Sequence, residues 1–217
     1  MITTDLFGAS QAPRRDEPLG DGAVVLRGFA LAEESALLQA VSAIVAQAPF
    51  RHLVTPGGLR MSVAMTNAGP RGWVSDRRGY RYDPIDPDSG QPWPPLPPAC
   101  MRLAVAAAAR AGFPGFVPDA CLLNRYEPGT RLSLHQDRDE RDLGLPIVSV
   151  SLGIPAVFLF GGLRRTDPVQ RVPLTHGDVV VWGGAARLRF HGVLPLKPNH
   201  HAALGECRIN LSFRRAG

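Results

Sequence analysis

The chain has 217 residues, 45% of them hydrophobic and 20% charged, which suits one domain with a sizeable core. No apolar run approaches the length that spans a bilayer, and the first residues lack the basic and apolar regions of a secretory signal. The three cysteines are widely spaced and odd in number, which is typical of free thiols in a reducing compartment. We therefore expect a cytoplasmic protein that does not contact a membrane.

The formal net charge is +5, and nearly all of the positive charge is arginine, because Lys197 is the only lysine. A positive balance favours polyanionic partners such as nucleic acids. Arginine also binds phosphate or carboxylate through paired hydrogen bonds. Genomic base composition has the same effect on arginine content, so charge alone leaves nucleic-acid binding undecided.

Up to residue 118 the sequence predicts little regular structure apart from one strand and two helices. Residues 1–22 are polar and rich in proline, glycine and charge, and we expect a flexible N-terminus there. A short apolar run at 23–26 predicts a strand. Apolar residues recur at three and four positions from 31 to 48, which predicts an amphipathic helix. A second helix is expected from about 99 to 111, after the proline-rich run 92–98.

Residues 50–98 combine turn signals with interleaved aromatic and arginine side chains. The members of this group are Trp73, Tyr80, Tyr82, Trp93, Arg71, Arg77, Arg78 and Arg81. A single-stranded nucleic-acid surface needs this combination, because bases stack on rings while guanidinium groups contact phosphates. The alternative interpretation is an edge hairpin with half-buried aromatic residues.

From residue 119 the sequence predicts short strands separated by turns. In chain order they cover 121–126, 132–137, 146–152, 156–160, 179–182, 188–193 and 207–213. Strands at this spacing, with no helices between them, indicate an all-β barrel or a double-sheet jelly roll with the two helices packed outside it. We expect a mainly β (α+β) protein with flanking helices, divided into 23–118 and a core at 119–217 within one structural unit.

His135 and Asp137 lie two residues apart in the predicted strand 132–137, so their side chains should project from one face. His191, on the predicted strand 188–193, is the candidate third member. Two imidazoles and one carboxylate form the facial triad of non-haem Fe(II) sites, which leaves positions open for a co-substrate and oxygen. Taken alone, a His-x-Asp pair also suits a loop ion pair or a capped turn.

Alternation in the last predicted strand places four polar residues on one face: Arg208, Asn210, Ser212 and Arg214. Arginines on the inner face of a barrel are costly to bury without an anionic partner. A dicarboxylate would supply that partner. Asn124 and Tyr126 alternate in the same way and would add an amide and a phenol. The alternative interpretation is a solvated basic strand.

Several segments of the chain together resemble the AlkB family of Fe(II)- and 2-oxoglutarate-dependent dioxygenases. They are Asn124–Tyr126, His135–Asp137, His191 and Arg208–Arg214. The resemblance extends from about residue 19 to residue 217 and includes stretches without obvious chemistry, such as 54–58, 146–153 and 176–184. A resemblance of this extent is highly specific.

The resemblance implies a double-stranded β-helix core with an N-terminal nucleotide-recognition lid within residues 23–118. It implies three iron ligands, namely His135, Asp137 and His191. It assigns 2-oxoglutarate to Asn124, Arg125, Tyr126, Arg208, Asn210, Ser212 and Arg214. It assigns the damaged base to Trp73, Tyr80, Arg81, Tyr82, Asp139 and Arg165. In this assignment Trp73 stacks on the flipped base opposite His135, and Asp139 lies near the exocyclic nitrogen of that base.

The reaction that the resemblance implies is oxidative dealkylation of bases such as 1-methyladenine and 3-methylcytosine. The co-substrate 2-oxoglutarate is oxidised to succinate and CO2 with consumption of O2, and the N-alkyl carbon is hydroxylated. The product then releases an aldehyde and the intact base. DNA is the expected nucleic acid, with RNA as a second candidate, and we expect a monomer.

Three other interpretations compete with DNA repair. A dioxygenase of the same fold that acts on tRNA, a protein or a small molecule would keep the triad, but a small-molecule enzyme would not need the aromatic and arginine segment. A zinc hydrolase would use the same three residues with a bound water, but the arginines of the last strand argue against it. A non-catalytic nucleic-acid-binding module gives no reason for an intact triad.

Overall fold

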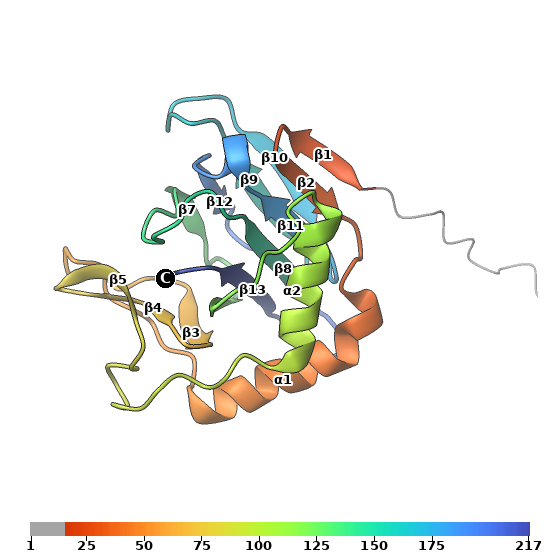
Figure 1. Ribbon diagram of the computed structural model, residues 1–217. Coiled ribbons are helices and arrows are strands. Elements are labelled where there is room, and N and C mark those ends of the chain that lie inside the picture. Colours follow the sequence, from red (N-terminus) through yellow and green to blue (C-terminus); the bar gives the residue numbers. More distant parts are fainter. Residues whose placement is uncertain (1–15) are drawn as a thin grey trace, which may run out of the picture.

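The computed structural model describes residues 16–217 as two facing sheets and a separate hairpin (Figure 1). The larger sheet has seven strands in the order β1 (Glu17–Gly20), β2 (Ala23–Leu26), β11 (Val179–Trp182), β8 (Ile147–Gly153), β13 (Arg208–Arg214), β6 (Ala120–Tyr126) and β3 (Ala64–Ala68). The smaller sheet has four strands in the order β10 (Gln170–Leu174), β9 (Ala156–Phe160), β12 (His191–Val193) and β7 (Leu132–His135). The hairpin consists of β4 (Gly72–Asp76) and β5 (Gly79–Asp83).

From β6 onward the chain passes back and forth between the two sheets. In the larger sheet β6, β8, β11 and β13 are neighbours, whereas β7, β9, β10 and β12 form the smaller sheet. Neighbouring strands in both sheets are antiparallel. This crossing between two sheets is the connectivity of a jelly roll. The predicted mainly β fold is therefore confirmed.

Two helices cover the outer face of the larger sheet, α1 (Glu34–Gln47) and α2 (Pro98–Arg110). Short 3-10 helices lie at Leu31–Glu33 and Gly184–Ala186. Leu37 and Ile44 of α1 and Ala104 of α2 share one buried cluster with Leu211 of β13. The small residues of α2 allow the helix to approach the sheet closely. Among the described residues, no helix combines the length and apolar character needed to cross a membrane.

The last strand, β13, divides its side chains between the two faces of the larger sheet. Ile209, Leu211 and Phe213 belong to the core beneath the helices. The alternate residues, which include Arg208 and Arg214, are buried on the inner face and line a cavity between the sheets. The two-faced pattern predicted for this strand is confirmed.

The N-terminal segment is more ordered than the sequence predicts. Glu17–Gly20 forms β1 at the edge of the larger sheet, paired with β2, within the stretch expected to be flexible. Pro18 and Gly20 weaken the strand pattern in the sequence. An edge strand tolerates proline because one of its sides needs no ladder hydrogen bonds. Residues 1–15 of that prediction lie outside the described residues.

The larger sheet also draws strands from both sides of the predicted boundary at residue 118. β1, β2 and β3 come from before it and β6, β8, β11 and β13 from after it. β3 pairs with β6 over its whole length and was not expected from the sequence. Its residues, Ala64–Ala68, include polar side chains that interrupt the apolar pattern of a strand.

Candidate active site

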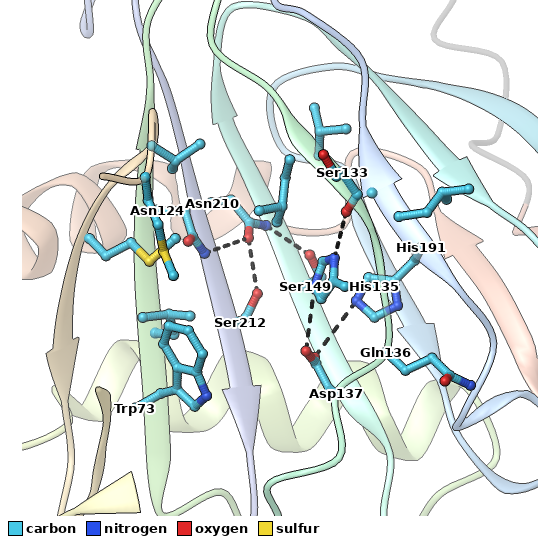
Figure 2. Close-up of a pocket in the computed structure, with 18 of the residues that line it drawn as sticks. Trp73, Asn124, Ser133, His135, Gln136, Asp137, Ser149, His191, Asn210 and Ser212 are labelled. Carbon is cyan, nitrogen blue, oxygen red and sulfur yellow. Dashed lines mark hydrogen bonds and ion pairs between the residues drawn. The ribbon is translucent and has the colours of Figure 1, made fainter. Parts of the chain in front are cut away.

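His135 and His191 are brought together by the pairing of β7 with β12. The two residues are direct cross-strand partners, and their ring centroids lie 4.3 Å apart. β7 ends at His135 and β12 begins at His191, so both strands are shorter than predicted on the side of the site. Figure 2 shows both rings turned toward Asp137.

Asp137 lies two residues beyond the end of β7, and not within the strand that the sequence predicts. Arg214 donates from Nε and Nη2 to Asp137 Oδ2, at 3.0 and 2.7 Å. Arg187 donates to the backbone carbonyl of Asp137 at 2.9 Å. His135 Nε2 lies 3.5 Å from Oδ1 of this carboxylate, and His191 Nε2 lies 3.7 Å from Oδ2. Tertiary contacts, and not strand alternation, therefore place the carboxylate.

Hydrogen bonds fix the protons of both imidazoles on Nδ1. His135 Nδ1 lies 2.9 Å from the carbonyl oxygen of Ser133, and His191 Nδ1 lies 3.1 Å from that of Arg189. A carbonyl only accepts, so each Nδ1 donates, and in the neutral ring Nε2, the nitrogen nearer to Asp137, carries the lone pair. Metal-binding histidines are oriented in the same way by their outer neighbours.

Burial and neighbouring charges set the protonation states of the three groups. Burial, followed by the nearby His135, lowers the pKa of His191 to about 3, so this ring is neutral at physiological pH. Burial opposes ionisation of Asp137, but Arg214 and the two imidazoles together keep the pKa of its carboxyl well below the ordinary value. Burial opposes protonation of His135, but its contact with Asp137 raises the pKa of this ring, so a bound metal would displace a proton there. The site therefore offers two imidazole nitrogens beside an anionic oxygen ligand.

This donor set fits a divalent iron ion. Ligand atoms of His135, Asp137 and His191 all lie within 4.8 Å of one another. Two imidazole nitrogens and one carboxylate oxygen on one side of an ion form the facial triad that binds Fe(II) and leaves positions open. Because Arg214 donates twice to Oδ2 of Asp137, Oδ1 is the oxygen of this carboxylate that would be free to hold a metal ion.

Arg208 is a buried cation without a full set of partners. The residue is 2% exposed, and its Nη2 donates to Ser151 Oγ at 2.9 Å. Its Nε and Nη1 have no hydrogen-bond partner among the described residues. Burial lowers the pKa of this guanidinium. A carboxylate ligand would remove the cost of an unpaired buried charge by accepting parallel hydrogen bonds, so the residue fits one end of 2-oxoglutarate.

Amides and hydroxyls next to this guanidinium form a connected network (Figure 2). Asn210 Nδ2 donates to Ser149 Oγ at 2.7 Å, and Ser212 Oγ donates to Asn210 Oδ1 at 2.9 Å. Asn124 Nδ2 lies 3.4 Å from the same Asn210 Oδ1, and its own Oδ1 is buried without a partner. Asn210 is therefore saturated by the protein itself, whereas Asn124, which lines the cavity, keeps an acceptor without a partner among the described residues.

The groups described so far border one cavity of about 580 Å³ between the sheets and the β4–β5 hairpin. Its volume is in the range of small-molecule sites and accommodates 2-oxoglutarate beside a nucleobase. The residues predicted from the sequence that line it are Trp73, Tyr80, Tyr82, Asn124, Tyr126, His135, Asp137, Asp139, His191, Arg208, Asn210, Ser212 and Arg214.

One face of the β4–β5 hairpin supplies the aromatic residues of the cavity. Trp73 is the cross-strand partner of Tyr82 and stacks on Tyr80, with ring centroids 5.5 Å apart and an angle of 13° between the planes. Trp73 Nε1 donates to Asp139 Oδ2 at 2.7 Å. In Figure 2 Trp73 lies across the pocket from His135. A planar ring and a carboxylate therefore border the side opposite the triad.

Three predicted arginines lie outside the lining of the cavity. Arg81 is on the opposite face of the hairpin, in a 3.0 Å ion pair with Asp76. Arg125 is exposed on β6 and lies 3.1 Å from Glu127. Arg165 is exposed in the loop between β9 and β10. Their roles in binding stay predictions that this geometry does not favour.

Glu140 and Arg187 are residues of the site that the sequence does not reveal. They are 6% and 2% exposed, and their ion pair measures 2.9 Å. Arg187 also bonds the backbone of Asp137, and Tyr82 donates its hydroxyl to Glu140 at 2.7 Å. Glu140 lies in the charged run 138–142, which is typical of a solvated loop. No sequence signal therefore marks it as buried.

A second cluster of candidate metal ligands, Glu34, His176 and His201, lies at the N-terminal end of α1. Here Nδ1 of His176 accepts the N–H of Gly153 at 2.9 Å, so the neutral ring carries its proton on Nε2, the atom directed at Glu34. The rings of His176 and His201 are stacked, with centroids 4.3 Å apart. Because the lone pair of His176 Nδ1 is already engaged, the cluster suits a close polar contact rather than a metal centre.

The His176 contact predicts a loss of stability in acid. Burial, followed by the neighbouring His201, lowers the pKa of His176 in the folded chain. The unfolded chain binds a proton there near the ordinary pKa of about 6.5, so acidification below that value favours unfolding. In His176→Asn the amide oxygen still accepts from Gly153 but does not titrate. We expect its Tm to fall less than that of the wild type between about pH 7 and pH 5. Parallel Tm curves would contradict this assignment.

Comparisons with known proteins agree with this geometry. A family model described as the 2OG-Fe(II) oxygenase superfamily matches residues 22–214. The chain is 55% identical over 213 residues to the alpha-ketoglutarate-dependent dioxygenase AlkB of Escherichia coli K12, covering 98% of both chains. It is 58% identical over 212 residues to the protein of that name from Salmonella typhimurium, covering 98% of this chain and 97% of the relative.

A solved structure supports the same relationship. The structure of OsALKBH1 matches with a TM-score of 0.82 and 29% identity, covering 93% of this chain and 100% of that one. Identity above one half along nearly the full length, together with the matched family model, exceeds what a shared fold alone produces. The chain belongs to the 2OG-Fe(II) oxygenase superfamily and, within it, to the AlkB family of alpha-ketoglutarate-dependent dioxygenases.

Proposed function

We propose that this protein repairs N-alkylated bases in DNA by oxidative dealkylation. It is an Fe(II)- and 2-oxoglutarate-dependent dioxygenase that acts on nucleic acids. The proposal extends this to lesions such as 1-methyladenine and 3-methylcytosine in DNA, and to a monomer that works in the cytoplasm. Buried free thiols at all three cysteines are consistent with that reducing compartment.

One observation supports the proposal above all others. The triad of His135, Asp137 and His191 lines the same cavity as Arg208, whose Nε and Nη1 have no partner in the described part of the chain. Trp73 borders the other side of this cavity. An oxidative site needs a metal and an anionic co-substrate at one end. A base-modifying site needs a ring surface at the other. This cavity combines all three features.

The residues divide the reaction between binding and orientation. Iron and 2-oxoglutarate, when bound, supply oxidation of the N-alkyl carbon by O2, which leaves succinate and CO2. Arg208 would pair with the distal carboxylate of 2-oxoglutarate. Arg214 orients Asp137 by donating twice to its Oδ2, and Asp137 would hold the metal with His135 and His191. Apolar lining residues such as Phe158 and Trp182 limit access of water to that end of the cavity.

The aromatic end of the cavity explains how an alkylated base is reached. An alkyl group on a Watson–Crick nitrogen is inaccessible inside a stacked duplex, so the enzyme acts on single strands or on an extruded base. Alkylation spoils pairing, which lowers the cost of extrusion for a damaged base. Trp73 supplies a ring face on which that base stacks, across the cavity from His135.

Asp139 is proposed to distinguish cationic lesions from neutral bases. The bases 1-methyladenine and 3-methylcytosine carry a positive charge, which a neighbouring carboxylate and a stacked indole both favour. In Asp139→Ala we expect kcat/KM to fall about ten-fold for 1-methyladenine, and by less for the neutral lesion 3-methylthymine. Steady-state kinetics on oligonucleotides that differ only in the lesion measure this ratio.

Asp142→Ala is the matched control for this variant. Asp142 is an exposed aspartate in the same loop, and its carboxylate accepts the N–H of Gly144 away from the cavity. It should leave both kcat/KM values near those of the wild type. An Asp139→Ala enzyme with the wild-type ratio between the two lesions would exclude charge discrimination by this carboxylate.

Formation of succinate tests the proposed substrate class. Purified protein with Fe(II), 2-oxoglutarate and ascorbate should form succinate slowly alone, and faster with a single-stranded oligonucleotide that carries one 3-methylcytosine. The unmethylated oligonucleotide of the same sequence is the control. Equal rates of succinate formation with both oligonucleotides would still indicate a dioxygenase, but they would exclude N-alkylated bases as its substrate.

A further inference from the structure

A chain of polar contacts runs from the β4–β5 hairpin to the carboxylate of the triad. Tyr82, on β5, donates its hydroxyl to Glu140 Oε1 at 2.7 Å. The same Oε1 lies 3.3 Å from Arg214 Nε. Arg214 in turn holds Asp137 Oδ2 through Nε and Nη2. The hairpin is a separate sheet, so these side chains give it a direct connection to the metal position.

Burial and charge balance make this connection stiff. Glu140 and Arg214 are each 6% exposed, and Arg187 is 2% exposed. Two carboxylates, from Asp137 and Glu140, are matched by two guanidinium groups. Arg187 holds the second oxygen of Glu140 at 2.9 Å and the backbone carbonyl of Leu145 at 3.0 Å. Moving one member would leave a buried charge unpaired, which is strongly unfavourable.

We propose that Glu140 is a positioning residue that links closure of the β4–β5 hairpin over a nucleobase to metal binding at Asp137. The inference rests on the proposed function, because it takes an alkylated nucleic acid as the ligand beneath the hairpin. Neither the identity of the triad nor that of the aromatic residues implies such a link. The contacts of Glu140 with both units carry it.

The link acts through preorganisation. A metal ion bound by Asp137 would add a further anchor to contacts that the chain already makes through Arg214 and Glu140. It would thereby hold the Tyr82 hydroxyl and the hairpin more firmly before a base arrives. When the hairpin is already ordered, binding of a base costs less conformational entropy of the protein. Linkage requires that the nucleic acid strengthen metal binding by the same factor.

Two tyrosines on the same face of the hairpin provide a matched pair of variants. Tyr82→Phe removes the hydroxyl that contacts Glu140 and keeps the ring. Tyr80 is 48% exposed and stacks on Trp73, outside the chain of contacts. Tyr80→Phe therefore removes an equivalent hydroxyl without touching Glu140. Both changes are conservative and leave the buried charges in place.

The experiment measures the affinity for DNA rather than turnover. A fluorescently labelled single-stranded oligonucleotide with one 3-methylcytosine is titrated with the full chain, with and without Mn(II), and without 2-oxoglutarate so that nothing reacts. We expect Mn(II) to lower the Kd of the wild type about five-fold, the typical effect of one hydrogen bond. In Tyr82→Phe this factor should fall to about one, whereas Tyr80→Phe should keep it.

A second variant and the reciprocal titration separate linkage from a merely structural role. Glu140→Gln keeps the shape but loses the charge, and it should also reduce the factor. In the wild type, saturating oligonucleotide should lower the Kd for Mn(II) by the same factor, measured by electron paramagnetic resonance of the free ion. A structural role alone would lower the Tm of these variants and leave the factor unchanged.

The outcomes are distinguishable from those of the proposed function. A wild-type Kd that does not depend on Mn(II), or a Tyr82→Phe factor equal to that of the wild type, overturns the link while oligonucleotide binding itself stands. Absence of preferential binding to the methylated oligonucleotide in every condition rejects the proposed function and this inference with it.

Discussion

Replacement of Asp137 by alanine is expected to abolish dealkylation, with a loss of more than about 1000-fold in kcat/KM. The metal site would then have only His135 and His191 as ligands. Arg214, having lost the carboxylate of Asp137, would place a positive charge next to the metal position. Arg214 lies 3.3 Å from Glu140 in the wild type and would keep that partner, so we expect the variant to be less stable but still folded. The loss should therefore come from the metal and not from unfolding.

Thermal denaturation with Mn(II) measures this directly. At about 100 times its Kd, a bound metal stabilises the wild type by about 2.7 kcal/mol. For a chain of this size that is a rise in Tm of about 5–10 °C. Asp137→Ala should show no such rise, whereas Asp139→Ala, two residues away, should show the full rise. If Mn(II) raised the Tm of Asp137→Ala as much as that of the wild type, this carboxylate would not be a metal ligand.

Replacement of Arg208 by alanine is expected to raise the KM for 2-oxoglutarate about 100- to 1000-fold, because one end of the co-substrate would be buried without a partner. Two donors of Arg208 lack partners within residues 16–217, and no carboxylate of that part of the chain pairs with it, so its removal leaves no buried charge there unpaired. We therefore expect little change in the free energy of unfolding without 2-oxoglutarate. Succinate formation across a range of 2-oxoglutarate concentrations gives the KM.

Arg125→Ala is the matched control for Arg208→Ala. Arg125 lies on the neighbouring strand β6, directly opposite Ile209, and its side chain is exposed beside Glu127. It should leave the KM for 2-oxoglutarate within about two-fold of the wild type. If both variants raised the KM equally, charge in general and not the buried guanidinium would explain binding.

The sequence predicts best where one long strand carries the site. β13 has seven residues, so its alternation separates Arg208 and Arg214 from Leu211 without any knowledge of its neighbours. The same rule, applied to β6, sets Arg125 on the face opposite Asn124, and in β5 it sets Arg81 opposite Tyr82. The structure agrees with alternation at these positions. Alternation therefore predicts which side chains face the cavity better than mere adjacency to a site residue does.

The sequence predicts least where tertiary contacts decide. Asp137 follows the end of β7, and its place depends on Arg187 and Arg214, which lie 50 and 77 residues further along the chain. Glu140 is buried only because both guanidinium groups and the hydroxyl of Tyr82 satisfy it. A local pattern contains no record of such partners. Its loop therefore looks like an ordinary charged surface segment.

The central claim is that the cavity removes an alkyl group from a damaged base. Mass spectrometry of an oligonucleotide with a single 1-methyladenine, after aerobic incubation with the protein, Fe(II), 2-oxoglutarate and ascorbate, tests it most directly. We predict loss of one methyl group, dependent on 2-oxoglutarate and absent with His135→Ala. If the oligonucleotide kept its single methyl group after prolonged incubation while succinate accumulated, the claim would be contradicted. The dioxygenase core would then act on another substrate.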